Sequence, residues 1–295
     1  MSMVDAYMVF TDLGDVLEKL KKMNVDVYTK FMRLVNWFRS IDGKVMVMFS
    51  GGVDSSVVLS TATAVLGTSR VVAVTFSMPI VDEEDLYWSS EIAKSLGVER
   101  IVIEVDILSE KEFVSNPVDR CYVCKRKMVE KLNEYIDLLD IDVVINGTNA
   151  SDLHTYRPGY RALREYGVRS PLAEIGITKE DSREIAKAFN LPNWSRASSS
   201  CLATRIPYGS PITLEKIVRI AKAERIIKDL TGLSLVRVRD HGNIARIEVD
   251  RNERRKFFSE ELMDRVAREL NRLGYRYVTL DLNGYRSGSF DTLTS

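Results

Sequence analysis

The chain has 295 residues, a length that can bury one large core or two modest ones. Its 42 Lys and Arg residues balance 42 Asp and Glu residues, and a net charge of zero disfavours a dedicated nucleic-acid-binding protein, which needs a strong positive field. The chain is 45% hydrophobic and 28% charged, as is usual for a globular protein. It has no apolar run near the roughly 20 residues that span a bilayer, and its first residues do not resemble a secretion signal. We therefore expect a cytoplasmic protein that does not contact membranes.

Residues 1–42 carry apolar side chains near helical spacing. This pattern predicts helices that pack on the domain that follows. The apolar positions are Leu17, Leu20, Met23, Val27, Phe31, Leu34 and Phe38.

The next part of the chain alternates short apolar strands with amphipathic helices. This alternation predicts a parallel sheet covered on both faces, and right-handed crossovers would make it doubly wound. Thr178 is a plausible cap for the last of these helices. The expected strands are 45–49, 71–76, 101–105 and 142–145, and the expected helices are 54–65, 83–96, 120–138 and 179–189.

The order of the predicted strands and helices changes after residues 207–209, where the strict alternation ends. Helices are expected at 214–230 and 259–273, and strands at 235–238, 244–249 and 277–280. We therefore predict an α/β protein in three parts, with N-terminal helices, a doubly wound parallel-sheet domain and a smaller C-terminal α/β domain. Their expected bounds are 1–42, 43–207 and 208–295.

The sharpest local signal is the string Ser-Gly-Gly-Val-Asp-Ser-Ser at Ser50–Ser56, between a predicted strand and a predicted helix. Gly51 and Gly52 let backbone N–H groups approach a phosphate, and the helix behind them presents its positive end. Asp54 could hold Mg²⁺. A Walker loop would need a lysine after its last glycine, and none is present. The alternative is a simple strand-to-helix turn; the full string favours a phosphate site, to which Ser50, Ser55 and Ser56 add hydroxyl donors.

The chain has three cysteines, an odd number that disfavours a disulfide framework. Cys121 and Cys124 begin a predicted helix and fall on nearly the same face, beside basic residues that favour thiolates. Cys201 lies far downstream in a loop of small residues. Four interpretations remain: a Cys121–Cys124 redox disulfide, a zinc site completed by His154 or His241, a three-thiolate iron–sulfur cluster, and three unrelated thiols.

The string at Ser50–Ser56 resembles the SGGxDS signature of the PP-loop ATP pyrophosphatases. Members of that superfamily adenylate a substrate and release pyrophosphate, whose phosphates the loop holds. The resemblance implies that ATP is bound by the loop. It further implies that the ends of the second and fourth strands, Phe76, Met78 and Gly147 among them, line the nucleotide site.

Eight further motifs, in order, resemble the LarE family of PP-loop sulfur transferases. That family adenylates a carboxylate of a pyridinium mononucleotide and converts it to a thiocarboxylate, the sulfur-insertion step in making the nickel-pincer nucleotide. The resemblance implies the same reaction here, a separate sulfur donor and a homo-oligomer. The motifs lie at 116–125, 146–149, 156–159, 169–172, 205–209, 237–239, 244–248 and 285–288.

One branch of the family sacrifices the sulfur of a single cysteine, and another binds a [4Fe-4S] cluster through three cysteines. The chain resembles the second branch, because Ser200 stands at the sacrificial position and Cys201 follows it. The resemblance implies that the cluster, held by Cys121, Cys124 and Cys201, delivers sulfide to the activated carbonyl. Glu224, Arg237 and Arg239 match family positions for the acceptor or its phosphate, and Arg205 is a further candidate.

Three rival functions are weighed against this one. A tRNA thiolase of the same superfamily would carry additional zinc-binding cysteine pairs or an RNA-binding appendage, and this chain has neither. An amide-forming adenylase has no need of three thiolates. The third rival is a non-catalytic iron–sulfur or nucleotide-binding module. Consumption of ATP without a chemically changed second substrate would favour it.

Overall fold

The computed structural model describes residues 12–154, 157–197 and 199–286, which form two compact units. The first unit comprises the described parts of Met1–Met78, Glu83–Val105 and Asp119–Ser199. The second comprises those of Pro79–Asp82, Asp106–Val118 and Ser200–Ser295. No helix among these residues is both long and apolar enough to cross a membrane. The motif residues Tyr156, Ser198, Ser287 and Gly288 lie outside the described residues.

The first unit is built on a four-stranded sheet in the order β3-β2-β1-β4, and every neighbouring pair is parallel. The predicted strands and their parallel pairing are confirmed. Because β1 lies between β2 and β4, the strand order reverses beside β1, where open sheets of this kind bind ligands at their carboxyl edge. The strands are β1 (Val45–Met48), β2 (Val71–Ser77), β3 (Glu99–Glu104) and β4 (Val143–Asn146).

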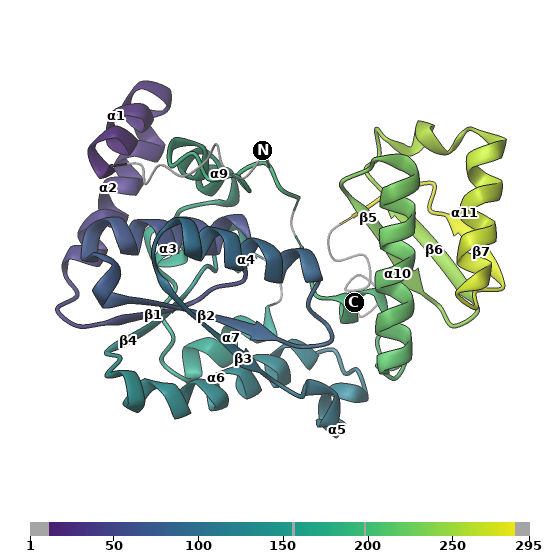
Figure 1. Ribbon diagram of the computed structural model, residues 1–295, viewed down its shortest axis with the longest axis horizontal. Coiled ribbons are helices and arrows are strands. Elements are labelled where there is room, and N and C mark those ends of the chain that lie inside the picture. The colour runs from purple at the N-terminus through teal and green to yellow at the C-terminus, as the bar shows by residue number, and fades with distance from the viewer. Residues whose placement is uncertain (1–11, 155–156, 198, 287–295) are drawn as a thin grey trace. The chain divides into compact units, whose positions relative to one another are not determined.

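Helices cover both faces of this sheet, as predicted. α3 (Val53–Leu66) and α4 (Glu83–Ser95) lie on one face, and α6 (Arg120–Leu139) lies on the other (Figure 1). This arrangement follows from right-handed crossovers, because the chain moves outward from β1 through β2 to β3 and then returns to β4.

The N-terminal helices α1 (Leu13–Met23) and α2 (Val25–Arg39) join the core of the first unit. Met23 is the exception to the predicted apolar stripe, with 47% of its surface exposed. The stripe breaks there because Asn24 ends α1 and caps α2, accepting hydrogen bonds from the backbone of Asp26 and Val27. The buried stripe residues are Leu20, Val27, Phe31, Leu34 and Phe38.

α9 (Lys179–Ala188) begins at the predicted cap. Thr178 and Asp181 form a reciprocal capping box, in which the side chain of each residue accepts from the other's backbone N–H. Several short elements have no clear sequence signal. They are α5 (Lys111–Val114), α7 (Pro158–Glu165) and α8 (Pro171–Ile175), with single 3₁₀ turns at Thr68–Arg70, Ile107–Ser109, Ala150–His154, Leu202–Arg205 and Arg254–Phe257.

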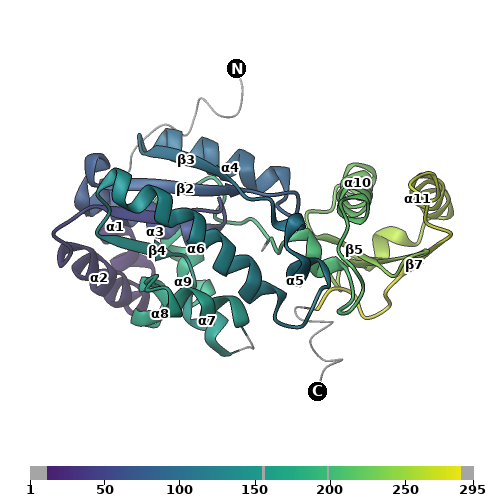
Figure 2. The same cartoon turned by 90° about the horizontal axis from the view of Figure 1, so that it is seen from below.

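The second unit has a three-stranded sheet in the order β5-β6-β7. β5 and β6 are antiparallel across the turn at residues 240–243, and β7 is parallel to β6. α10 and α11 lie side by side on one face of this sheet and are seen nearly end-on in Figure 2. The elements are α10 (Leu214–Thr231), β5 (Val236–Asp240), β6 (Ile244–Val249), α11 (Glu260–Arg272) and β7 (Tyr277–Leu280).

Two earlier stretches of chain are built into this second unit. The Nδ2 atom of Asn116 donates to the carbonyl oxygens of Pro207 at 2.7 Å and Ser210 at 2.9 Å. The backbone N–H of Leu202 donates to the carbonyl oxygen of Ile80 at 2.8 Å. The unit is therefore assembled from three separate parts of the sequence.

Candidate functional site

The loop Ser50–Ser56 connects β1 to α3 at the carboxyl edge of the parallel sheet. Gly51 has φ +76°, and a Cβ atom there would lie 2.5 Å from the carbonyl oxygen of Asp85 and 2.7 Å from the nitrogen of Ser89. Gly52 is the N-cap of α3, and no side chain caps this end of the helix in the described structure. The first amides of α3 have no partner within the helix, so they remain available to an anion.

Hydroxyl groups line the same loop. The Oγ atoms of Ser50 and Ser55 lie 3.2 Å apart, and those of Ser55 and Ser56 both donate to the carbonyl oxygen of Gly52, at 3.0 and 2.9 Å. Ser50 is exposed, whereas Ser55 and Ser56 are buried. The loop is therefore a fixed cradle, with one hydroxyl at the surface and two that hold its shape.

Asp54 is half-buried in the first turn of α3, and its Oδ1 atom has no hydrogen-bond partner in the described structure. Burial raises the pKa of this carboxyl above its ordinary value. The nearby side chain of Ser182 lowers the pKa, the charge of Asp152 raises it, and Asn149 lowers it, but burial prevails. An unsatisfied buried carboxylate oxygen beside a phosphate cradle fits a divalent cation, which prefers such ligands.

Gly147, at the end of β4, lies directly against the start of α3. A Cβ atom at Gly147 would lie 2.7 Å from the nitrogen of Ser55 and 2.8 Å from its Cα atom. Phe76 is the next-to-last residue of β2, and Met78 follows that strand; both are buried. Three of the predicted nucleotide-site segments thus lie at the same edge of the sheet, because parallel strands place their carboxyl ends together.

Asn193 is a loop residue that was not predicted from the sequence. It is 1% exposed, and its Nδ2 atom donates to the carbonyl oxygen of Gly51 at 2.8 Å and to the Oγ atom of Ser56 at 2.9 Å. Arg196 pairs with Asp85 at 2.6 Å and so fixes the same segment to α4. No local pattern marks Asn193, since its partners lie about 140 residues earlier in the chain.

Cys121 and Cys124 lie in the first turns of α6, and both are half-buried. α7 packs tightly on this turn, because a Cβ atom at Gly159 would lie 3.3 Å from the carbonyl oxygen of Cys121. Between the two cysteines, the Tyr122 hydroxyl donates to Glu165 at 2.6 Å. The prediction that Cys121 and Cys124 begin a helix is confirmed, since α6 starts at Arg120.

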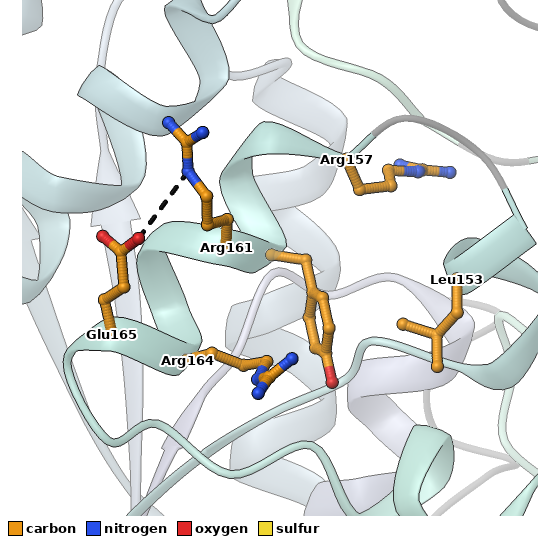
Figure 3. A pocket seen from close by; sticks show the side chains of 6 residues that line it. Leu153, Arg157, Arg161, Arg164 and Glu165 are labelled. Atoms are coloured by element: carbon orange, nitrogen blue, oxygen red, sulfur yellow. Dashed lines mark ion pairs between the residues drawn. The ribbon is translucent and has the colours of Figure 1, made fainter.

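A pocket of about 600 Å³ opens on α7, beside this cysteine-bearing turn (Figure 3). Acidic side chains offset part of the positive charge of its arginines. Arg157 pairs with Asp152 at 2.6 Å. Arg161 lies 3.7 Å from Glu165, and Figure 3 marks this ion pair with a dashed line. Arg161 also stacks over the ring of Tyr122 at 4.5 Å. The lining residues are Leu153, Arg157, Tyr160, Arg161, Arg164 and Glu165.

Cys201 belongs to the second unit, whereas Cys121 and Cys124 belong to the first. Cys201 is half-buried and is the N-cap of the 3₁₀ turn Leu202–Arg205. Within the described residues of either unit, no group of three His, Cys, Asp or Glu side chains is arranged to hold a metal ion. His241 is exposed in the turn between β5 and β6, and the side chain of His154 lies outside the described part of the chain.

Arg205 and Glu224 form a buried ion pair in the second unit, with exposed fractions of 1% and 3%. Burial alone would raise the pKa of Glu224, but the charges of Arg205 and Arg237 outweigh it and hold the pKa below its ordinary value. Val238 donates its backbone N–H to the same carboxylate at 2.9 Å.

Arg237 and Arg239 are both buried on β5, and both face acidic side chains. Arg237 lies 4.0 Å from Glu224, and burial lowers the pKa of its guanidinium. Arg239 pairs with Glu248 at 2.8 Å and donates to the carbonyl oxygen of Thr204 at 2.7 Å. The acceptor-site residues predicted from the family resemblance therefore form one connected network with the end of the Cys201 turn.

Comparison with known proteins agrees with this architecture. The asparagine synthase family matches residues 39–121, which include the loop Ser50–Ser56. The pyridinium-3,5-bisthiocarboxylic acid mononucleotide synthase of Lactiplantibacillus plantarum is 38% identical over 252 residues, which cover 85% of this chain and 90% of that protein. This chain belongs to the LarE family. An uncharacterized protein of Synechocystis sp. is 36% identical over 89% of this chain and 97% of its own length.

More distant similarity reaches other members of the PP-loop superfamily. A subunit of the glutamine-hydrolysing GMP synthase of Archaeoglobus fulgidus is 24% identical over 64% of this chain and 65% of its own length. Membership in the LarE family and the PP-loop domain together make this chain an ATP-dependent sulfur-transferring enzyme. The string at residues 50–56, which resembles the PP-loop signature, lies within the part of the chain that the family model matches.

Proposed function

We propose that the enzyme adenylates a carboxylate of a pyridinium mononucleotide and releases pyrophosphate. Sulfide from a [4Fe-4S] cluster then forms a bond to the activated carbonyl carbon, the bond from that carbon to the adenylate oxygen breaks, and AMP leaves with the oxygen. The observation that carries the proposal is the uncapped, glycine-built PP-loop at the carboxyl edge of the sheet, with the unsatisfied Oδ1 atom of Asp54 beside it. The 38% identity to a pyridinium-3,5-bisthiocarboxylic acid mononucleotide synthase supplies the substrate class.

In the adenylation step, an oxygen of the substrate carboxylate attacks the α-phosphorus of ATP, and the bond from that phosphorus to pyrophosphate breaks. Backbone amides at the start of α3 and the exposed hydroxyl of Ser50 would stabilise the charge that builds on the departing pyrophosphate. Asp54 would hold Mg²⁺, which neutralises phosphate charge when bound. Phe76, Met78 and Gly147 would line the nucleotide site.

The three cysteines would be the protein ligands of the cluster. Cys121 and Cys124 lie one helical turn apart and are half-buried, as thiolate ligands of a partly accessible cluster would be. Cys201 would supply the third thiolate and leave one iron without a protein ligand. When bound, such a cluster supplies sulfide through that iron, and no resident cysteine needs to be sacrificed.

The acceptor would be recognised by the second unit. Arg237 and Arg239 would bind its phosphate as a paired clamp, with Glu224 beside them. We further propose that residues 43–207 carry the nucleotide chemistry and residues 208–295 the acceptor residues. A cytoplasmic homo-oligomer supplied by a separate sulfur donor completes the proposal.

Anaerobic iron and acid-labile sulfide analysis of the wild type and of Cys201→Ala tests the cluster. We expect about four irons per chain in the wild type and a large loss in the variant. If wild-type protein prepared anaerobically contains zinc or no metal, the cluster proposal is wrong, and the cysteines have a redox, sacrificial or structural role instead.

ATP–pyrophosphate exchange tests the first step independently of the cluster. The wild type should exchange labelled pyrophosphate into ATP only when a pyridinium mononucleotide carboxylate is present. Asp54→Asn should lose this exchange. Exchange that depends on tRNA instead would favour the rival thiolase, and salt-sensitive tRNA binding would support it.

A further inference from the structure

Arg205 is held from two directions at once. Its Nε and Nη2 atoms donate to the carboxylate of Glu224, on α10, at 2.8 and 3.1 Å. Its Nη1 atom donates to the carbonyl oxygens of Ser200 at 2.7 Å and Cys201 at 3.1 Å. The same atom lies 2.7 Å from the Oγ atom of Ser200 and 2.9 Å from that of Thr204. With 1% of its surface exposed, Arg205 makes all these bonds inside the second unit.

Other hydrogen bonds also hold the segment around Cys201, and its residues Leu202, Ala203 and Ile206 are buried. The carbonyl oxygen of Cys201 also accepts from the backbone N–H of Thr204 at 3.0 Å and from its Oγ atom at 2.8 Å. The backbone N–H of Leu202 is bonded to Ile80 at 2.8 Å. Ser199 and Ser200, just before Cys201, are exposed. Arg239 donates to the carbonyl oxygen of Thr204 at 2.7 Å, so it holds the end of the segment. Arg205 is the side chain that links residues 200 and 201 to the interior of the unit.

The carboxylate that anchors Arg205 is itself fixed. Glu224 is 3% exposed, and its Oε1 atom accepts the backbone N–H of Val238, in β5, at 2.9 Å. A continuous series of bonds thus runs from β5 through Glu224 and Arg205 to the peptide of Cys201.

We propose that Arg205 is a positioning residue that fixes the peptide of Cys201, and with it the direction of the sulfur, rather than a ligand of the substrate phosphate. This inference rests on the proposed function only in taking Cys201 as a residue of the sulfur site. Of the five N–H groups of the guanidinium, one on Nε and one on Nη2 meet Glu224, and the two on Nη1 are shared among two carbonyl oxygens and two hydroxyls. Binding a phosphate would break this buried ion pair and leave Glu224 with Arg237 at 4.0 Å as its remaining ion-pair partner, which is costly. The proposed phosphate ligand Arg239 differs, because its partner Glu248 would keep Arg246 at 3.0 Å.

Amide hydrogen exchange of residues 199–206, followed by mass spectrometry, tests the proposal on the full chain. In Arg205→Lys and Glu224→Gln, exchange of this segment should be at least tenfold faster than in the wild type. Exchange of the peptide that spans α2 (Val25–Arg39) is the internal reference and should not change, because that helix belongs to the core of the first unit and carries none of the three cysteines. Unchanged exchange at residues 199–206 in both variants would overturn the proposal.

Arg219→Lys is the matched control. Arg219 pairs with Asp240 at 2.6 Å in the same unit, and none of its hydrogen bonds in the described structure reaches residues 199–206. Its loss should leave exchange of that segment as in the wild type. Thr204→Val keeps Arg205 and removes one donor to the Cys201 carbonyl oxygen, so it should give a smaller acceleration and serves if the charge variants fold poorly.

Kinetics separate positioning from phosphate binding. If Arg205 positions Cys201, Arg205→Lys lowers kcat for sulfur insertion while KM for the mononucleotide stays within about threefold. A raised KM with unchanged kcat and unchanged exchange would instead make Arg205 a phosphate ligand and overturn the proposal. Absence of a cluster would contradict the proposed function and leave the exchange result standing, so the two failures are distinguishable.

Discussion

The Nδ2 atom of Asn193 lies 2.9 Å from the Oγ atom of Ser56, and the same atom holds the carbonyl oxygen of Gly51 at 2.8 Å. One buried amide group thus joins both ends of the PP-loop. The loop keeps its shape before any ligand is bound, which lowers the entropy that binding would otherwise cost.

Asn193→Ala should loosen this loop. The substitution leaves the carbonyl oxygen of Gly51 and the hydroxyl of Ser56 without this partner, which should cost about 1–3 kcal/mol of unfolding free energy. We also expect ATP affinity to fall, measured by titration calorimetry alongside urea unfolding. Asn252→Ala, at an exposed position, is the control and should change neither quantity appreciably. Wild-type affinity in Asn193→Ala would show that the loop does not depend on this amide.

Gly147→Ala should damage the same loop from the opposite side. Its Cβ atom would lie 2.7 Å from a backbone nitrogen, which cannot move aside as a flexible side chain can. We expect a loss of about 1–3 kcal/mol in unfolding free energy, together with weaker ATP binding. Gly176→Ala is the control. Gly176 has φ +88°, so an alanine there strains the backbone, but its Cβ atom would have no other atom within 4 Å to clash with. This variant should leave ATP binding unchanged. Equal effects of the two variants on ATP binding would contradict this prediction.

Asp54→Asn should stabilise the fold while abolishing adenylation. Because burial raises the pKa of Asp54, the folded chain binds this proton more tightly than the unfolded chain, so stability falls as pH rises through the raised pKa. At pH 7 the neutral amide should add about 1 kcal/mol to the unfolding free energy, since it removes a buried charge with an unsatisfied oxygen. The gain should vanish well below the ordinary pKa of 3.8, where the carboxyl is protonated in both states.

Thermal unfolding between pH 3 and 8 checks that prediction. Asp229→Asn is the control, because Asp229 is in an exposed pair with Arg225 and should contribute little at any pH. A lower melting temperature for Asp54→Asn at pH 7 would show that the carboxylate stabilises the fold instead.

Glu224 should make the second unit sensitive to acid. Its pKa is held below the ordinary value of 4.5, so its contribution to stability is present above that pH and is lost as pH falls through the depressed pKa. Glu224→Gln should therefore unfold more easily at pH 7 and show a flatter dependence on pH below 4.5. Glu18→Gln, at an exposed site, should keep the wild-type profile. Parallel profiles for the wild type and Glu224→Gln would contradict the prediction.

Periodicity and punctuation along the chain predict most of the fold. The apolar runs that became β1, β2 and β4 are buried in the sheet, and Thr178 caps α9 through a hydrogen bond only three residues away. Such features depend on neighbours in sequence, so the sequence displays them directly. The break at Met23 was missed because helical spacing continues across Asn24 even though the chain changes direction there.

The supports of the candidate site could not be predicted in the same way. Asn193 acts on residues about 140 positions earlier, and Arg205 meets Glu224 only because α10 folds back over the Cys201 turn. From the sequence, Arg205 is a further candidate for binding the acceptor or its phosphate, whereas in the structure its guanidinium contacts a buried carboxylate and two carbonyl oxygens. Partners that tertiary folding brings together leave no local pattern.

Each of the two units is made of three separate segments of the chain, and this limits how the protein could be divided or recombined. The chain passes between the units five times, at residues 78/79, 82/83, 105/106, 118/119 and 199/200. A fragment that begins at residue 200 would lack both Ile80 and Asn116, and with them the partners of Leu202, Pro207 and Ser210. The second unit therefore cannot be transferred as one continuous C-terminal segment. A fusion protein or a shuffled gene would also have to include Pro79–Asp82 and Asp106–Val118 to reproduce it.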